Sequence, residues 1–122
     1  RTYHTIIPGF IMKGNKPVGP FGVMGGFMQP QGHMQVVMNM LDFNMDPQTA
    51  LDAPRFRWDK GLEVALENTF SNELIQGLQN KYHHVKIELR GSGFGRGQII
   101  QKTKNGYIAG TETRCDGTIA YY

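Results

Sequence analysis

Apolar and β-branched residues fill two short segments near the start of the chain. Residues 5–12 read Thr-Ile-Ile-Pro-Gly-Phe-Ile-Met, and residues 17–24 read Pro-Val-Gly-Pro-Phe-Gly-Val-Met. Such runs, bounded by turn residues, are typical of strands. The Lys-Gly-Asn-Lys sequence at 13–16 predicts a turn, so we expect a hairpin that ends at Gly25-Gly26. Pro8 lacks a ladder donor and predicts an edge position or a bulge.

The pattern becomes helical over residues 31–43. Its apolar positions are too dense for one stripe along a helix: Met34, Val36, Val37, Met38, Met40, Leu41 and Phe43. A helix that is apolar on most of its surface is a buried helix, so we predict that other layers cover it. Asn44 is suited to cap its C-terminus.

Two further helices have start signals. Asp46-Pro47 places a capping carboxylate before a proline at the first helical position, and Pro54 ends that short helix. Ser71 begins the third helix. Apolar residues then recur at helical spacing: Leu74, Ile75, Leu78 and Tyr82.

Strand patterns account for most of the remaining sequence. Residues 55–58 and 62–66 flank Asp-Lys-Gly in the manner of a hairpin. Further strands are predicted at 85–89, 98–103 and 107–110, the last two joined by an Asn-Gly turn. Strands, then helices, then mostly strands predict a single α+β layered domain over 1–122 with a largely antiparallel sheet.

Composition restricts the function classes. With 39% hydrophobic and 19% charged residues, the 122-residue chain is an ordinary globular domain. A net charge of +3 permits anionic partners, but the sequence lacks the basic stripe of nucleic-acid binders. Cys115 is the only cysteine, which excludes an internal disulfide and a thiolate metal cluster. No apolar run approaches the roughly 18 residues of a membrane-spanning helix.

The chain begins at Arg1 and enters an apolar segment almost at once, without an initiator methionine or a signal-peptide pattern. We therefore expect a piece of a longer product. Its cellular compartment is not readable from these residues.

The main candidate for chemistry is the pair Gly25-Gly26, which lies between a predicted strand and a predicted helix. Glycine lets the backbone approach a ligand closely and adopt positive φ. Backbone N–H groups at such a place can meet developing negative charge. A plain turn is the alternative interpretation.

Other candidates are weaker. The adjacent His83 and His84 lack metal-ligand spacing and are expected on the surface. His33 lies near the glycine pair and either contacts a ligand or caps neighbouring backbone. No serine, cysteine or threonine lies in a motif such as Gly-x-Ser-x-Gly, so the nucleophile of an enzyme would lie outside these residues.

Residues 90–97, Arg-Gly-Ser-Gly-Phe-Gly-Arg-Gly, are similar to Arg-Gly-rich RNA-binding segments and to phosphate loops. They lack the Gly-Lys-Ser/Thr ending and the Gly-x-Gly-x-x-Gly spacing. We expect a flexible loop that leads into a strand. RNA binding would require Arg90 and Arg96 and would weaken steeply with salt.

Four segments, in order, resemble the γ-glutamyltranspeptidase family: residues 17–33, 46–55, 93–98 and 111–121. The resemblance extends over essentially all of 1–122 and matches the C-terminal part of that family's small, catalytic subunit. It implies the four-layer αββα fold of the N-terminal-nucleophile hydrolases. In that family the precursor cleaves itself to expose a catalytic threonine, whose own α-amino group acts as base. Here that threonine would lie upstream of the chain.

The resemblance also assigns site residues. Gly25 and Gly26 match the glycines whose N–H groups form the oxyanion hole. His4 and Thr5 match two serines that bind the substrate's α-carboxylate in transpeptidases. The substitution keeps hydrogen-bond donors but adds a bulkier, titratable group, which weakens the expectation of strict γ-glutamyl specificity.

Two more departures indicate the transpeptidase-like and cephalosporin-acylase-like branch. Val23-Met24 replaces the small residues and proline common before the glycines, and the Thr-Glu-Thr-Arg at 111–114 replaces Asp-Pro-Arg. Hydrolysis of γ-glutamyl or related acyl amides is the expected reaction, with transfer to an amine as the less favoured outcome.

The expected partners are the large subunit, the rest of the small subunit and a small-molecule amide substrate. Neither a metal nor an organic cofactor is implied, and this segment alone is expected to be inactive. The alternative from another class is a binding or structural domain that keeps the scaffold without the chemistry.

Overall fold

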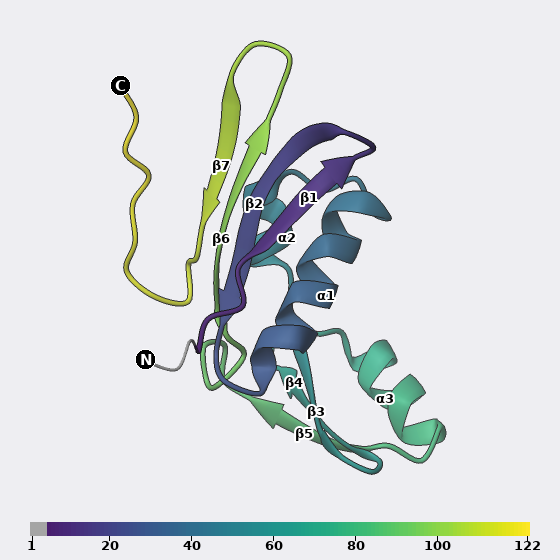
Figure 1. The fold of residues 1–122 in the computed structure, drawn as a ribbon. Helices are drawn as coiled ribbons and strands as arrows, with labels where there is room; N and C mark the ends of the chain where they lie inside the picture. The colour runs from purple at the N-terminus through teal and green to yellow at the C-terminus, as the bar shows by residue number, and fades with distance from the viewer. Residues whose placement is uncertain (1–4) are drawn as a thin grey trace.

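The computed structural model describes residues 5–122. The elements in chain order are β1 (Gly9–Lys13), β2 (Lys16–Met24), α1 (Met28–Leu41), α2 (Pro47–Asp52), β3 (Phe56–Lys60), β4 (Glu63–Glu67), α3 (Asn72–Asn80), β5 (His84–Glu88), β6 (Arg96–Lys102) and β7 (Tyr107–Thr111). They form a four-stranded sheet in the order β1-β2-β6-β7 and a three-stranded sheet in the order β3-β4-β5 (Figure 1). The α+β class and the largely antiparallel pairing are as predicted. Within residues 5–122, only β4 and β5 pair in parallel, because α3 connects them as a crossover.

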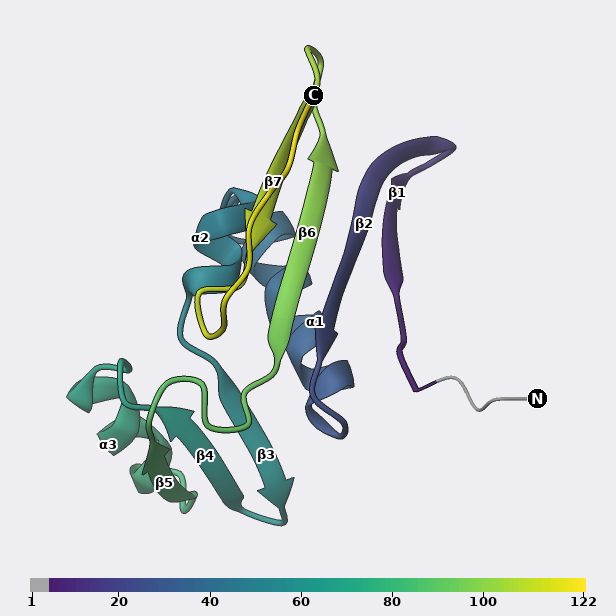
Figure 2. The same ribbon diagram turned by 90° about the vertical axis from the view of Figure 1, so that its left-hand side faces the viewer.

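Helices α1 and α2 cover one face of the four-stranded sheet, while the segment after β7 runs back beside the other face (Figure 2). The core lies between the sheet and these helices. It consists of Val23, Val36, Met40, Ala50, Leu51 and Ile99. The predicted hairpin of β1 and β2 is present, and β1 is an edge strand with a register shift between Ile11 and Met12.

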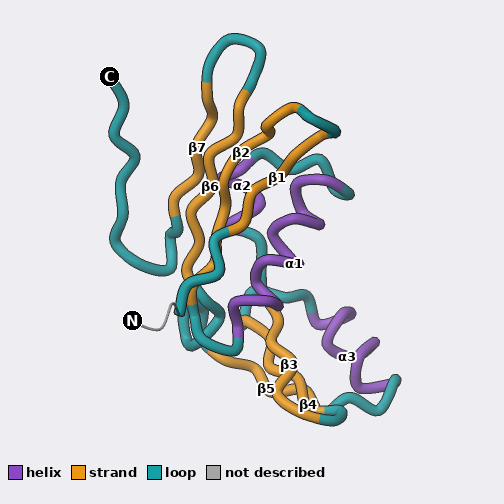
Figure 3. The backbone as a smooth tube through the Cα atoms, in the orientation of Figure 1, coloured by secondary structure: helices purple, strands orange, loops and turns teal. Residues whose placement is uncertain are grey.

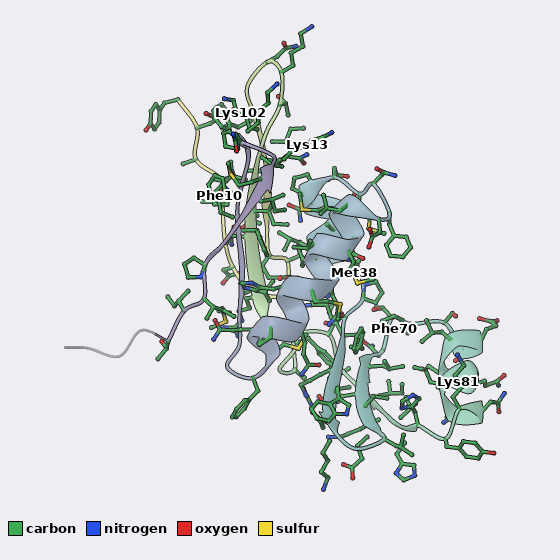
Figure 4. All side chains as sticks on the ribbon, turned by 45° about the vertical axis from the view of Figure 1, so that its right-hand side comes forward. Phe10, Lys13, Met38, Phe70, Lys81 and Lys102 are labelled. Carbon is green, nitrogen blue, oxygen red and sulfur yellow. The ribbon has the colours of Figure 1, made fainter. Side chains whose placement is uncertain are left out.

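The opposite face of the same sheet carries exposed apolar residues beside polar ones such as Arg96 and Gln98. Register pairs Met24 with Arg96 and Ile100 with Ala109 on this face. Met24 is 50% exposed and Ile100 is 45% exposed. Phe10, labelled in Figure 4, is also exposed on the first strand.

Helix α1 begins at Met28, earlier than the predicted residue 31. Pro30 lies in its first turn, where a missing N–H costs no helical hydrogen bond. The helix has no side-chain cap, because the carbonyl groups of the preceding turn receive its first N–H groups instead. Figure 3 shows this short turn between β2 and α1. Because no side chain caps this helix start, the sequence contains no capping residue that would mark it.

Within residues 5–122 the helix is buried on one side only, so the prediction that other layers cover the rest of its surface stays a prediction. Val36 and Met40 are buried, but Met34 is 43% and Met38 is 40% exposed. Leu41 is also exposed. The second side of the helix therefore has no covering layer among the described residues.

Helices α2 and α3, which have side-chain N-caps, begin where the sequence predicted. Asp46 accepts hydrogen bonds from the N–H groups of Gln48 and Thr49, and α2 ends at Asp52 before Pro54. Ser71 caps α3. Tyr82 does not lie on that helix as predicted, because the chain leaves the helix after Asn80 and Tyr82 adopts φ 67°.

Helix α1 also holds the edge of the three-stranded sheet. The side chain of Gln35 accepts from Phe56 N–H at 2.9 Å and donates to Phe56 O at 2.9 Å. Gln31 makes the same pair of bonds with Trp58, at 2.7 and 3.1 Å. Gln31 and Gln35 are four residues apart, which is about 6 Å along a helix, and Phe56 and Trp58 are two residues apart, which is about 6.8 Å along a strand. The two spacings are similar, so each glutamine side chain can bond one of these two residues of β3.

Candidate active site

The turn between β2 and α1 contains the glycine pair. Gly25 has φ 142° and Gly26 has φ 59°, both of which favour glycine. Their carbonyl oxygens accept from Met28 N–H and Gln29 N–H, each at 3.1 Å. Within residues 5–122 their own N–H groups have no acceptor, and both residues are exposed. The turn thus offers two donors to an incoming group at the positive end of α1.

The turn is held from behind by Gly95. A Cβ atom built on Gly25 would lie 3.0 Å from the Gly95 Cα atom. A Cβ atom built on Gly95 would lie 2.7 Å from both the Met24 carbonyl oxygen and a methyl of Val23. The two backbones therefore meet at a distance that excludes side chains on either residue.

Thr5 is brought toward this turn by Gln29. The Gln29 side chain donates to Thr5 O at 3.0 Å and accepts from Ile7 N–H at 3.3 Å. Because Gln29 N–H is bonded to Gly26, the amide links residues 5–7 to the glycine turn. The other predicted carboxylate-binding residue, His4, lies outside the described residues.

An open pocket of about 340 Å³ lies beside the turn. Its walls come from residues 6–9, from β2, from β6 and from the first half of α1, and include Met24, Arg96 and His33. The ring of His33 is tilted over Phe21 at 5.1 Å between centroids. Partial burial lowers the pKa of His33, which favours the neutral imidazole. Of the two roles considered for His33, its position fits contact with a ligand in this pocket.

Sequence reasoning missed a buried cluster of four charges next to the turn: Arg55, Glu67, Glu112 and Arg114. Arg55 Nη2 lies 2.9 Å from Glu112 Oε2, and Arg114 Nη1 lies 2.8 Å from Glu112 Oε1. Arg114 Nη2 also contacts Glu67 Oε2 at 2.5 Å. All four side chains are at most 1% exposed. The one signal in the sequence was the altered Thr-Glu-Thr-Arg segment, which contributes Glu112 and Arg114.

The charges compensate one another. Burial alone would raise the pKa of Glu67, but hydrogen bonds from Arg114 and from Arg55 N–H outweigh it, so the pKa lies below its usual value. Burial and repulsion from Arg114 lower the pKa of Arg55. Burial acts the same way on Arg114, yet its carboxylate partners raise the pKa overall. Both arginines stay charged at neutral pH.

The Arg-Gly segment is packed against the protein, unlike the flexible loop that we expected. Phe94 is fully buried, and Arg57 lies over its ring at 5.3 Å. Arg90 donates to the Asp52 carboxylate at 3.2 Å and to the Thr113 hydroxyl at 2.8 Å. These contacts occupy Arg90, one of the two arginines that RNA binding would need.

No metal site accompanies this arrangement. Residues 5–122 contain no group of three or more histidine, cysteine, aspartate or glutamate side chains placed to hold an ion. His84 is exposed, as expected, whereas His83 is half-buried in an apolar pocket beneath α3. Among the described helices, none has the length and apolar character to cross a membrane.

Comparison with known proteins places this geometry in a fold class. The chain superposes on the cephalosporin acylase of Bacillus halodurans with a TM-score of 0.92 and 55% identity, covering 100% of this chain and 23% of that one. A γ-glutamyltranspeptidase from Pseudomonas nitroreducens, complexed with L-DON, gives a TM-score of 0.85 over 100% of this chain and 64% of that chain. Its identity is only 15%, so it supports the fold alone. The chain has part of the αββα fold of the N-terminal-nucleophile hydrolases.

The family follows from sequence as well. The model of the γ-glutamyltranspeptidase family matches residues 1–122. The glutathione hydrolase-like YwrD proenzyme of Bacillus subtilis (strain 168) is 33% identical over 126 residues, which cover 96% of this chain and 24% of that protein. The chain belongs to the γ-glutamyltranspeptidase family. It spans about a quarter of the length of the YwrD proenzyme and of the Bacillus halodurans acylase.

Proposed function

We propose that the chain is the C-terminal part of the small, catalytic subunit of an amidohydrolase that cleaves γ-glutamyl or related acyl amides. The observation that carries this proposal is the Gly25-Gly26 turn, because its two exposed N–H groups lack an acceptor within residues 5–122. Family membership, and the names glutathione hydrolase-like and cephalosporin acylase among its relatives, support the reaction class.

In the proposed reaction a threonine outside this chain attacks the amide carbonyl carbon, while its α-amino group takes the hydroxyl proton. The N–H groups of Gly25 and Gly26 donate to the oxyanion of the tetrahedral intermediate. Collapse of the intermediate breaks the C–N bond, and the α-amino group returns the proton to the departing amine. Water then attacks the acyl-enzyme and releases the acid, or an amine takes the acyl group.

Thr5, together with His4, binds the carboxylate of the acyl donor in this proposal. The link from Thr5 through Gln29 to Gly26 supports this placement, because it brings residue 5 to the oxyanion turn. A hydroxyl and an imidazole both donate to a carboxylate.

The partners are the remaining small-subunit segment and a large subunit of the same precursor. The exposed apolar residues of the four-stranded sheet and the exposed side of α1 support this, because such surfaces require covering layers. The nucleophile would lie in the absent part of the small subunit, so residues 1–122 alone would be inactive.

The test is to express the complete gene and to determine its chains by intact mass and N-terminal sequencing. Two chains, the smaller beginning with threonine and containing this sequence, with hydrolysis of a γ-glutamyl anilide or an acyl anilide, are the expected result. A single uncleaved chain without amide hydrolysis would contradict the proposal and would favour a binding or structural domain.

A further inference from the structure

We propose that the buried cluster of Arg55, Glu67, Glu112 and Arg114 is a positioning device for the oxyanion hole. It fixes residues 91–97, which are the loop before β6 and the first two residues of that strand, behind Gly25, and this sets the direction of the Gly25 and Gly26 N–H groups. The inference rests on the proposed function for its catalytic consequence, but its structural part is testable without activity.

The first step is that the cluster binds the backbone of this loop. Arg55 Nη1 donates to Phe94 O at 3.1 Å and to Gly95 O at 3.2 Å. Glu112 Oε2 accepts from Gly97 N–H at 2.8 Å. Arg55 therefore donates hydrogen bonds to both peptide groups that flank Gly95.

The second step is that the cluster is anchored elsewhere in the fold. Arg114 donates to Leu51 O at 2.7 Å and to Ala53 O at 2.9 Å, at the end of α2. Glu67, from the end of β4, accepts from Arg55 N–H at 2.9 Å. The loop is therefore tied to α2 and to the three-stranded sheet at once.

The third step is the contact between the loop and the turn. Gly95 adopts φ 76°, and a side chain on it would overlap with Met24 O and Val23. Gly25 has no room on the side of Gly95 either. Because the backbones touch directly, a displacement of Gly95 is transmitted to Gly25 without a side chain to absorb it.

The cost of the cluster also favours a role beyond stability. Moving ion pairs from water into a protein interior often gains nothing over apolar packing of the same volume. Here Arg55 Nε is buried without a partner among the described residues. Four charges gathered from three separate segments fix a unique arrangement of those segments, which apolar side chains would hold less specifically.

The test uses the complete protein with Glu112→Gln, which removes the charge that pairs with both arginines and keeps the side-chain shape. Leu66→Ala is the matched control, because Leu66 is 2% exposed in β4 and its truncation destabilises the fold without touching the loop. Glu112→Asp, which keeps the charge on a shorter side chain, is the second variant if Glu112→Gln does not fold.

The expected result for Glu112→Gln is a fall in kcat of about 10- to 100-fold with KM changed less than about twofold, measured per folded and processed enzyme. Leu66→Ala should keep kcat within about twofold at a temperature where both variants are folded. Glu112→Asp should lie between the two. Equal kcat values for Glu112→Gln and Leu66→Ala would overturn the proposal.

Hydrogen exchange provides the readout that does not depend on catalysis. The amides of Met28 and Gln29, which donate to Gly25 O and Gly26 O, should exchange about tenfold faster in Glu112→Gln than in Leu66→Ala, because the loop no longer holds the turn. Unchanged exchange would also overturn the positioning role. If the complete wild-type protein hydrolyses no amide, the proposed function fails, and exchange alone decides whether the cluster positions the turn.

Discussion

At the residue scale, Gly25 and Gly26 have different surroundings. Gly25 is backed by Gly95, whereas a Cβ atom on Gly26 would meet no atom within 4 Å. Gly26 nevertheless adopts φ 59°, a conformation that costs an alanine about 1–2 kcal/mol. Backbone conformation therefore favours glycine at both positions, and space restricts Gly25 in addition.

Gly26→Ala should lower kcat because the backbone relaxes away from positive φ and turns the N–H groups of this turn. Gly14 in the β1–β2 turn is a matched control, with φ 59° and open space around it. Both substitutions should cost about 1–2 kcal/mol of unfolding free energy. Only Gly26→Ala should lower kcat, by about 10²-fold, in assays of the complete protein. Equal activity of the two variants would argue against an oxyanion hole at this turn.

The low pKa of Glu67 predicts acid sensitivity. A carboxyl whose pKa is lower in the folded state stabilises the fold above its usual pKa, and this contribution is lost as pH falls toward the folded-state pKa. The thermal midpoint of the wild type should therefore fall below about pH 4.5, and more steeply than that of Glu67→Gln. Glu63→Gln, at an exposed position of the same strand, should keep the wild-type pH profile. Parallel profiles for Glu67→Gln and the wild type would contradict the role of this carboxylate.

At the scale of elements, α1 connects the two sheets. Its apolar side packs on the four-stranded sheet, and its glutamines replace a missing neighbour strand at the edge of β3. The same helix begins at the glycine turn, so the site and the junction of the sheets share one rigid element. Figure 4 shows the length of this helix between Met38 and the turn.

Gln35→Ala should lower the unfolding free energy by about 1–3 kcal/mol, because it leaves the N–H and C=O groups of Phe56 without partners in a part-buried place. Gln31→Ala is the control, since its bonds to Trp58 are exposed and water can replace them. Urea unfolding of the two variants measures the difference. Equal losses of unfolding free energy would contradict the expectation that the part-buried bonds of Gln35 contribute more than the exposed bonds of Gln31.

At the scale of the whole molecule, the two faces of the four-stranded sheet differ in what covers them. One face carries the core with α1 and α2, and the other exposes apolar residues such as Met24 and Ile100. The αββα fold places a second sheet against a face of this kind. Among residues 5–122, only the segment after β7 runs beside this face (Figure 2), which would leave most of it to a second sheet of the complete protein.

Ile100→Lys in the complete protein should impair assembly, because a charge would enter the proposed interface between the sheets. Leu62→Lys is the matched control: Leu62 is 49% exposed, close to the 45% of Ile100, but lies in the β3–β4 turn. The yield of folded, processed protein by size-exclusion chromatography and intact mass should fall only for Ile100→Lys. An equal yield from both variants would show that this face of the sheet stays exposed to solvent in the complete protein.

The sequence predicted most elements because their signals are local. Asp46, Ser71, the turn sequences and the alternation along strands each act within a few residues, so their positions were found nearly to the residue. The start of helix α1 was predicted too late, because the carbonyl groups of the turn, and not a side chain, accept hydrogen bonds from its first N–H groups. Tyr82 matched the helical spacing, but the left-handed turn ends the pattern before it.

What the sequence determined by itself is the α+β class, the family and the glycine turn as a candidate site. Only the tertiary structure decided what stands behind that turn: Gly95 in contact with Gly25, and a charge cluster that joins Arg55 to Glu112 across 57 positions of sequence. No local period links such residues. The physical reason is that buried charges and touching backbones are selected by their surroundings in space, whereas caps, turns and strands are selected by their neighbours in the chain.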